Sequence, residues 1–194
     1  MNRKVAGIVL AAGGSSRFGS PKQLLPWKKS TVLNTVIETA RLTGLNPVIV
    51  VLGANVETIK PMVPGDCVVV TNEAWSQGQS SSLRLGLAQL TEDIEGVLVM
   101  LGDQPQVNPN YCDSIVQKGL DSGRITIPYV NDRRANPVYF PKSTLKRLSE
   151  VTGDQGGRAI FSDFQVELVP WLDDLMALDI DTPDDYERLK ACYT

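Results

Sequence analysis

The sequence contains no histidine, and this absence removes several classes of chemistry. Ser-His-Asp and Cys-His nucleophilic catalysis, histidine-ligated zinc and imidazole acid–base catalysis all depend on that side chain. Cysteine is also scarce, because Cys67, Cys112 and Cys192 lie far apart and none stands in Cys-x-x-Cys spacing. An odd number of dispersed thiols predicts neither a disulfide framework nor a zinc site. Any catalysis must therefore rest on carboxylates, amines, guanidinium groups and metal ions.

Long apolar runs and long basic runs are missing too. The apolar stretches are far shorter than the ~20 residues that cross a bilayer, and the first residues lack the charged-then-apolar pattern of a signal peptide. The net charge is −3, so duplex nucleic acid would meet little electrostatic attraction. We therefore expect a soluble, cytoplasmic protein with neither a nucleic acid nor a membrane as its partner.

What the sequence does contain is a regular alternation of apolar segments and amphipathic ones. A chain of 194 residues with 42% hydrophobic content suits one compact domain over residues 1–194. Continuous apolar runs predict buried strands at residues 5–12, 48–53, 67–71 and 96–101. Helical spacing predicts helices at residues 32–42, 56–62, 80–90 and 108–120, with Ser30 or Thr31 available to cap the first of them and Asn108 to cap the last. This order predicts a parallel sheet with helices on both faces and with ligand chemistry at the carboxyl ends of its strands.

The regular alternation of predicted strands and helices ends in the last third of the chain. Residues 125–130 and 137–140 flank a polar turn and predict a hairpin. The remaining elements predicted here are helices at residues 143–151, 159–163 and 182–189 and strands at residues 166–169 and 177–180. The whole chain is thus predicted to be α/β: a three-layer αβα sandwich around a Rossmann-like, mostly parallel sheet, with a C-terminal mixed or antiparallel insertion that completes one site.

The loop after the first predicted strand is rich in glycine and carries two basic residues. It runs Leu10-Ala11-Ala12-Gly13-Gly14-Ser15-Ser16-Arg17-Phe18-Gly19-Ser20-Pro21-Lys22. Backbone N–H groups of such a turn approach phosphate oxygens closely, and Arg17 and Lys22 add positive charge for a triphosphate. The loop has neither the Gly-Lys-Ser/Thr triplet of a Walker loop nor the Gly-x-Gly-x-x-Gly dinucleotide fingerprint. The alternative is a surface loop rich in turn-forming residues.

Acidic residues follow two later predicted strands. Asp103 comes directly after the strand at residues 96–101, where a hard oxygen ligand for Mg²⁺ would meet phosphates held by the first loop. An aspartate that caps a turn is the alternative. Asp181 stands at the end of another predicted strand, whereas Asp184 and Asp185 are expected to be solvated at the start of a helix.

Together these segments resemble the molybdenum cofactor cytidylyltransferase-like (molybdopterin nucleotidyltransferase) family, a branch of the GT-A-type nucleotidyltransferase fold. The resemblance covers almost the full chain. The matching residues are Leu10-Ala11-Ala12-Gly13, Ser16-Arg17, Gly19, Lys22-Gln23-Leu24-Leu25-Pro26, Asn72, Trp75, Gly78, Ser81-Ser82-Leu83-Arg84, Leu101-Gly102-Asp103-Gln104-Pro105, Asn136-Pro137-Val138, Gly153-Asp154, Gly157-Arg158 and Asp179-Ile180-Asp181-Thr182-Pro183.

The resemblance implies a role for each of these groups. Lys22, Arg17 and Asp103 would be catalytic, and Asp103 and Asp181 would hold Mg²⁺, with Mn²⁺ as the alternative. The residues implied to bind the nucleotide are Leu10, Ala11, Ala12, Gly13, Gly14, Arg17, Lys22, Asn72, Ser81, Ser82 and Gly102. The implied reaction transfers CMP from CTP onto the terminal phosphate of molybdenum-bound molybdopterin and releases pyrophosphate, and a molybdoenzyme would receive the product.

Three features bear on the choice of substrates. Guanylyltransferase relatives tend to have Leu-Ala-Gly-Gly in the first loop, so Ala12 favours CTP over another NTP. The serine run at residues 80–82 either offers hydroxyl groups to a pyrimidine or caps a helix. The turn at residues 133–137 lacks the glycine and histidine common in the family, so its arginines either bind an acceptor phosphate or lie at a solvated hairpin tip. Arg134, Asn136 and Asp154 are the predicted acceptor-binding residues.

Three other functions remain open from the sequence. The first is a guanylyl or sugar-1-phosphate nucleotidyltransferase, and the second is a non-catalytic molybdopterin carrier or chaperone. The third is a nicotinamide-dependent oxidoreductase, which needs an acidic residue near the end of the second strand. The chain has Gly53-Ala54-Asn55 there.

Overall fold

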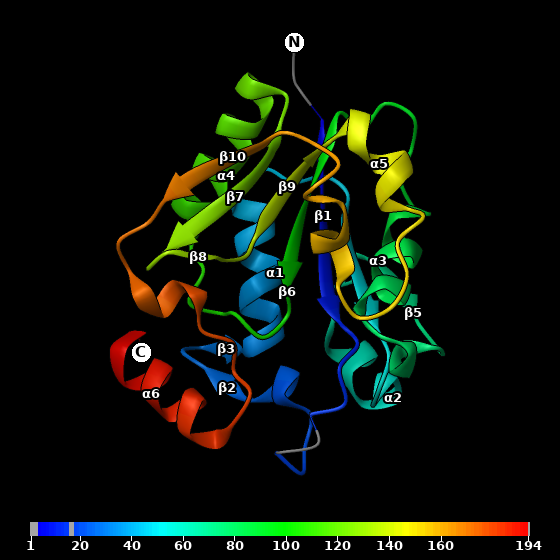
Figure 1. The fold of residues 1–194 in the computed structure, drawn as a ribbon. Coiled ribbons are helices and arrows are strands. Elements are labelled where there is room, and N and C mark those ends of the chain that lie inside the picture. The colour runs from blue at the N-terminus through cyan, green and yellow to red at the C-terminus, as the bar shows by residue number, and fades with distance from the viewer. Residues whose placement is uncertain (1–3, 16–17, 194) are drawn as a thin grey trace.

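The computed structural model describes residues 4–15 and 18–193, which form a mixed α/β fold around one large central sheet (Figure 1). The strand order is β10-β7-β9-β6-β1-β4-β5, and β8 pairs with β7. The first four strands of this sheet in the chain are β1 (Val5–Ala11), β4 (Val48–Leu52), β5 (Val68–Thr71) and β6 (Gly96–Leu101). The pairings among these four strands are all parallel, as the sequence predicts.

The second half of the sheet is mixed. It contains β7 (Ile125–Val130), β8 (Arg133–Arg134), β9 (Val138–Pro141) and β10 (Val166–Pro170). Strand β9 is antiparallel to both β6 and β7, whereas β10 is parallel to β7. The predicted mostly parallel sheet with a mixed C-terminal part is thus confirmed, but the hairpin differs from the prediction. The tight turn joins β7 to β8, and its two residues, Asn131 and Asp132, have positive φ angles of 46° and 59°.

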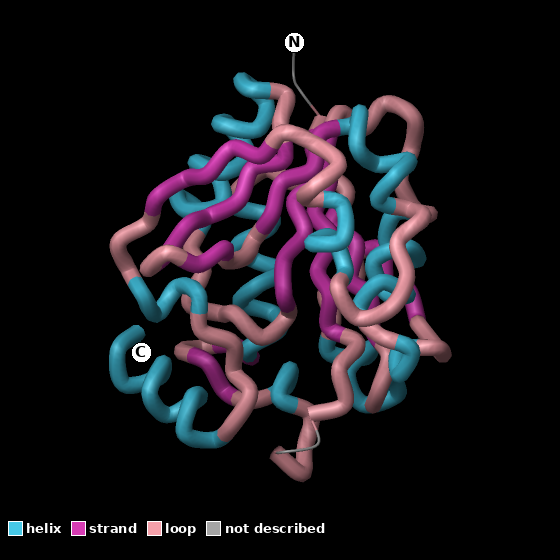
Figure 2. The backbone as a smooth tube through the Cα atoms, viewed as in Figure 1, coloured by secondary structure: helices cyan, strands magenta, loops and turns pink. Residues whose placement is uncertain are grey.

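Helices cover both faces of the sheet (Figure 2). Helices α1 (Val32–Leu42) and α4 (Pro109–Ser122) pack on one face, and α3 (Gln79–Leu87) and α5 (Lys142–Leu148) pack on the other. Strand β1 supplies alternate side chains to the two cores, because Val9 lies with α1 and α4 and Ile8 lies with α3. A short helix α2 (Val56–Ile59) continues as a 3-10 turn over Lys60–Met62. No helix in the described part of the chain is long and apolar enough to cross a membrane.

Helix starts are set by the local sequence. Thr31 accepts a hydrogen bond from the backbone N–H of Asn34 and begins α1. Asn108 accepts one from Tyr111 N at 2.9 Å and begins α4, with Pro109 at the first helical position. Both caps are as predicted from the sequence.

The C-terminal helix packs against a small hairpin rather than against the large sheet. Helix α6 (Pro183–Tyr193) begins with a reciprocal pair in which Thr182 Oγ1 accepts from Asp185 N while the Asp185 carboxylate accepts from Thr182 N. It buries Tyr186 and Leu189 against the fully buried Trp27 of the hairpin. The hairpin consists of β2 (Pro26–Trp27) and β3 (Ser30–Thr31), which the sequence did not predict.

The predicted strand at residues 177–180 is wrong. A 3-10 helix, η5 (Asp174–Ala177), ends there, and an irregular segment leads to α6. The backbone carbonyls of Leu175 and Leu178 accept hydrogen bonds from Gln106 Nε2, at 3.0 and 2.6 Å. The Gln106 side chain thus supplies hydrogen bonds to these carbonyls, so the segment does not need a neighbouring strand to pair with them.

Candidate functional site

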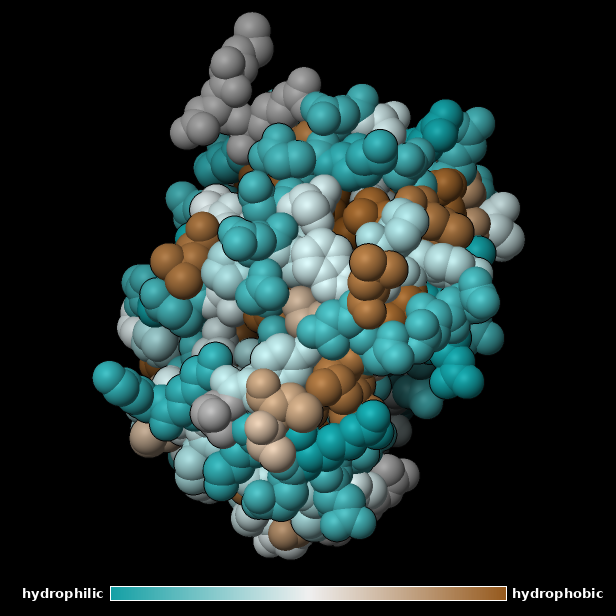
Figure 3. Space-filling view, turned by 90° about the vertical axis from the view of Figure 1, so that its left-hand side faces the viewer, coloured by the Kyte–Doolittle hydropathy of each residue, from teal (hydrophilic) through white to brown (hydrophobic). Residues whose placement is uncertain are grey.

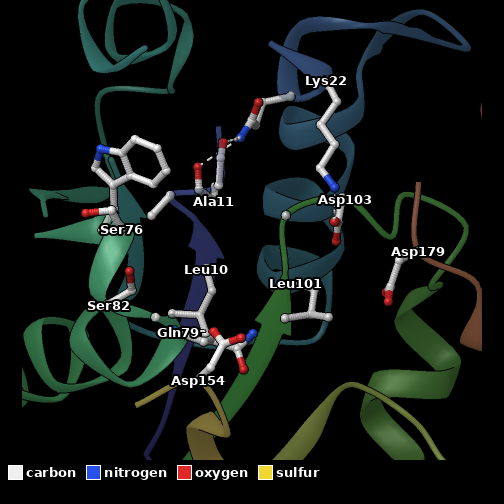
Figure 4. Close-up of a pocket in the computed structure, with 16 residues that line it drawn as sticks. Leu10, Ala11, Lys22, Ser76, Gln79, Ser82, Leu101, Asp103, Asp154 and Asp179 are labelled. Atoms are coloured by element: carbon white, nitrogen blue, oxygen red, sulfur yellow. Dashed lines mark hydrogen bonds and ion pairs between the residues drawn. The ribbon is translucent and has the colours of Figure 1, made fainter. Parts of the chain in front are cut away.

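A cavity of about 410 Å³ opens at the carboxyl ends of β1 and β6 (Figure 4). These strands are neighbours, and the strand order reverses beside β1, which is the usual ligand position in an open parallel sheet. The lining residues come from the ends of β1 and β6, from the four loops that follow β1, β5, β6 and α5, from α3 and from the segment before α6. They are Leu10, Ala11, Ala12, Gly13, Lys22, Gln23, Trp75, Ser76, Gly78, Gln79, Ser82, Leu101, Gly102, Asp103, Asp154 and Asp179.

Most of the residues predicted to bind a nucleotide line this cavity. They are Leu10, Ala11, Ala12, Gly13, Lys22, Ser82 and Gly102. Gly102 lets the two strand ends approach, since a Cβ atom there would lie 2.8 Å from the Ala11 Cβ. Arg17, predicted to contact the triphosphate, lies outside the described residues.

Lys22 and Asp103 form an ion pair at the floor of the cavity. The Lys22 Nζ lies 2.6 Å from Asp103 Oδ2, 3.3 Å from Asp181 Oδ1, and donates to the Ile180 carbonyl at 2.9 Å. Both members of the closer pair are largely buried. Burial by itself lowers the pKa of Lys22, but the charges of Asp103 and Asp181 outweigh it and the pKa is raised. The ammonium therefore stays charged between two carboxylates.

A buried glutamine holds the glycine-rich loop in place, and no separate role was predicted for it from the sequence. Gln23 Nε2 donates to the carbonyls of Ala11 and Gly13, at 3.0 and 3.1 Å. The Ser15 hydroxyl accepts from Lys22 N at 3.0 Å. These bonds hold the start and end of the loop together before any ligand arrives.

A third carboxylate, Asp179, also lines the cavity and was not predicted. Its Oδ1 accepts from Gln104 Nε2 at 2.8 Å. Burial, together with the charges of Asp103 and Asp181, raises the pKa of Asp179 to about 6. Both Gln104 and Asp179 stood in motifs that carry the family resemblance, and this was the only signal for them in the sequence.

The wall opposite these carboxylates is the start of α3, and its serines do not cap the helix. Gly78 is the N-cap residue, with a φ of 105°. Ser82 lines the cavity, whereas Asn72 and Ser81 lie behind it. Asn72 Nδ2 donates to both serine hydroxyls at 2.8 Å. The structure therefore makes Asn72 and Ser81 supports of Ser82, although the sequence predicted direct contact with the nucleotide.

Trp75 forms the outer edge of the same wall and was singled out only within the family motif. The residue is 39% exposed. A Cβ atom on Gly14 would lie 3.2 Å from the indole, and one on Gly53 would lie 2.6 Å from the Trp75 Cβ. Gly14, predicted to bind the nucleotide, is not among the residues that line the cavity. Its close approach to the Trp75 ring indicates that it packs against the tryptophan instead.

The three predicted acceptor-binding residues do not come together. Asp154 lines the main cavity and accepts from Gln79 N at 3.3 Å. Asn136 lines an adjoining narrow slot with Phe140 and Phe161. Arg134 lies farther out, with its guanidinium carbon 5.3 Å from the centre of the Phe161 ring.

The residues at the cavity floor fit a divalent cation. Among the described residues no group of three His, Cys, Asp or Glu side chains is arranged to hold a metal. Two carboxylates, those of Asp103 and Asp181, nevertheless face one positive charge, the Lys22 ammonium. Carboxylate oxygens combined with phosphate oxygens from a ligand are the donor set that Mg²⁺ and Mn²⁺ prefer.

This fold and this site define a nucleotide-binding α/β protein whose glycine-rich loop faces carboxylates across a cavity. The model of the MobA-like NTP transferase domain matches residues 7–169, and the chain belongs to this family of nucleotidyltransferases.

Curated relatives carry different activities. The chain is 30% identical to the nicotine blue oxidoreductase of Paenarthrobacter nicotinovorans, over 95% of this chain and 96% of that one. It is 27% identical to the molybdenum cofactor cytidylyltransferase of Escherichia coli, over 96% of each chain.

Solved structures support both the fold and a divalent metal. Rv0371c of Mycobacterium tuberculosis has a TM-score of 0.89 and 32% identity, covering 98% of this chain and 99% of that one. A manganese complex of Rv0371c has a TM-score of 0.83 and 30% identity, covering 97% and 98%. Divalent metal binding is thus a property found within this family.

Proposed function

We propose that this protein transfers CMP from CTP onto the terminal phosphate of molybdenum-bound molybdopterin and releases pyrophosphate, with Mg²⁺ as its metal. The observation that carries this proposal is the cavity in which the loop at residues 10–14 faces Lys22 and Asp103. The 27% identity to a molybdenum cofactor cytidylyltransferase over nearly the full chain supports the choice of acceptor.

Nucleotidyl transfer needs charge neutralisation and positioning more than covalent help from the protein. An oxygen of the acceptor phosphate attacks the α-phosphorus of the nucleotide, the bond from that phosphorus to the bridging oxygen breaks, and pyrophosphate leaves with the electron pair. The backbone of residues 10–14 orients the triphosphate. Asp103 and Asp181 would hold Mg²⁺, which would supply electrostatic stabilisation of the phosphate oxygens.

Lys22 would change partners during this reaction. In the ligand-free protein its ammonium is neutralised by Asp103 and Asp181. The phosphates of a bound nucleotide would offer the ammonium further acceptors, and it would then stabilise the negative charge that develops on them. No proton has to be removed from the acceptor, because a phosphate oxygen is already anionic, and this suits a chain without histidine.

Base selection is assigned to the wall made by α3 and the first loop. Ser82 Oγ accepts from Asn72, so its own proton is available to an acceptor atom such as O2 or N3 of cytosine. Ala12 lies against Gly53 beside Trp75, and its methyl group takes volume that a glycine would leave open. A smaller opening favours a pyrimidine over a purine.

A pyrophosphate-release assay with CTP, GTP, ATP and UTP tests the proposal, with molybdenum-bound molybdopterin present or absent. We expect release with CTP only when the acceptor is present, loss of release with EDTA, and recovery with Mg²⁺. Ala12→Gly should raise the relative rate with GTP. Equal rates with all four nucleotides would contradict the assigned base selection, and full turnover in EDTA would contradict the metal.

A second candidate is an oxidoreductase, favoured by the 30% identity to nicotine blue oxidoreductase. One observation argues against binding of a nicotinamide cofactor. Such a site needs an acidic residue near the end of the second strand to bind a ribose, and β4 is followed by Gly53-Ala54-Asn55, which contains no carboxylate. Consumption of NADH or NADPH with a dye acceptor, without pyrophosphate release from any nucleotide, would favour this candidate.

A further inference from the structure

A second hollow, distinct from the nucleotide cavity, lies between the β7–β8 turn and the segment that leads into α6. Its volume is about 420 Å³, within the range of small-molecule sites. Its lining residues are Val130, Asn131, Arg133, Arg134, Asp174, Leu175, Ala177, Leu178 and Arg188. None of them lines the nucleotide cavity. The side of the molecule that carries β10 and α6 faces the reader in Figure 3 and is mostly hydrophilic, with only small hydrophobic groups.

The charge of this hollow is opposite to that of the chain. Three arginines and one aspartate line it, although the chain has a net charge of −3. The guanidinium groups of Arg133 and Arg188 make no hydrogen bond or ion pair with any residue in the described ranges. The Arg134 guanidinium lies over the face of the Phe161 ring. Arginines that converge on a hollow without a carboxylate partner are suited to a phosphate, which they hold through bidentate hydrogen bonds.

The remaining lining residues indicate more than a bare ion. Val130, Leu175 and Leu178 give the hollow an apolar wall. Asp174 adds one acceptor for a hydroxyl or amino group. We propose that this hollow binds a small organic phosphate, with its phosphate on Arg133 and Arg188 and its carbon skeleton on the apolar wall.

The position of the hollow links it to the nucleotide cavity. Leu178 lines the hollow, and its neighbour Asp179 lines the cavity. Gln106 holds this segment by its hydrogen bonds to the carbonyls of Leu175 and Leu178. A ligand in the hollow therefore touches the same short segment that carries Asp179 to the cavity and Asp181 to the Lys22 ammonium.

An NMR titration with inorganic phosphate tests the site directly in the full chain. We expect saturable amide shifts at residues 130–134, 174–178 and 188. The double substitution Arg133→Ser with Arg188→Ser should weaken this binding about tenfold or more, since each charged hydrogen bond contributes about 1.5–3 kcal/mol. The matched control is Lys60→Ser with Lys146→Ser, which removes the same charge from two exposed lysines outside the hollow and should leave the affinity unchanged.

Two results would overturn the proposal: shifts confined to residues 10–14 and 22, or an equal loss of affinity in both double variants. The pattern of amide shifts in the wild-type protein alone decides whether the shifts are confined to residues 10–14 and 22. Phosphate that binds in the nucleotide cavity shifts the amides of residues 10–14, whereas phosphate in the hollow shifts those of residues 130–134, 174–178 and 188. The titration therefore distinguishes failure of the proposed hollow site from failure of the proposed function.

A turnover assay, which rests on the proposed function, then identifies the source of the organic phosphate. If it is the acceptor itself, the arginine variant raises KM for the acceptor and leaves KM for the nucleotide unchanged. If it is a separate compound, both KM values are unchanged and the loss of phosphate binding alone supports the site.

Discussion

The Lys22 ammonium lies 2.6 Å from the Asp103 carboxylate, although 81 positions separate the two residues in the sequence. This pair joins the glycine-rich loop after β1 to the loop after β6. The contact is possible because β1 and β6 are parallel neighbours, with Leu10 paired to Leu101.

Asp103→Asn tests the role of this pair. The substitution keeps the shape of the side chain and removes its charge, so the proposed metal loses a ligand and Lys22 keeps only Asp181 as a carboxylate partner. We expect turnover to fall by about 100-fold or more, with little change in the circular dichroism spectrum. Asp113→Asn, on the exposed side of α4, is the control and should retain full activity. Near-normal turnover of Asp103→Asn would remove Asp103 from the catalytic site.

Asp179 predicts a specific dependence of stability on pH. Its pKa in the folded protein is about 6, against an ordinary value of 3.8. Between these values the folded protein holds a proton that the unfolded chain has released, so the stability contributed by this group falls as the pH rises from about 4 to 6. Each unit of pKa shift corresponds to about 1.4 kcal/mol.

Urea unfolding of the wild type and of Asp179→Asn at pH 4.5 and pH 7 measures this effect. The wild type should lose about 1–3 kcal/mol more unfolding free energy than the variant over this interval. An identical pH dependence in both proteins would show that Asp179 titrates normally.

Two serines in the same turn of α3 should behave differently. Ser82→Ala removes a hydroxyl from the cavity wall, and we expect KM for the nucleotide to rise about 2–10-fold. The Ser80 hydroxyl is buried and has no hydrogen-bond partner among the described residues. Ser80→Ala should therefore leave KM unchanged without lowering the melting temperature. Equal effects of the two substitutions on KM would argue against a cavity role for Ser82.

Two glycines provide a matched test of the packing around Trp75. A Cβ atom on Gly53 would lie 2.6 Å from the Trp75 Cβ and 2.8 Å from the Ala12 carbonyl, whereas one on Gly65 would meet nothing within 4 Å. Gly53→Ala should lower the unfolding free energy by about 1–3 kcal/mol and weaken nucleotide binding, because it displaces the cavity wall. Gly65→Ala should change neither quantity. Thermal unfolding and nucleotide titration measure the two effects.

The local sequence determined most of the secondary structure. The continuous apolar runs of β1, β4 and β6 and the capping residues Thr31 and Asn108 predict elements that the structure confirms. Each signal lies within a few residues of the element that it determines. The segment before α6 was mispredicted because Gln106, about 70 positions away in the sequence, satisfies its carbonyls.

The sequence by itself also determined which kinds of chemistry are open to the chain. Because histidine is absent, the groups that remain are the backbone of the glycine-rich loop, basic side chains and carboxylates. Only the tertiary structure decided how these groups meet. It brought Asp179 beside Asp103, placed Ser82 at the cavity and Ser81 behind it, and separated Arg134 from Asp154. The physical reason is that such contacts depend on strand order and on the route of each loop, which bring together residues with no relation in sequence.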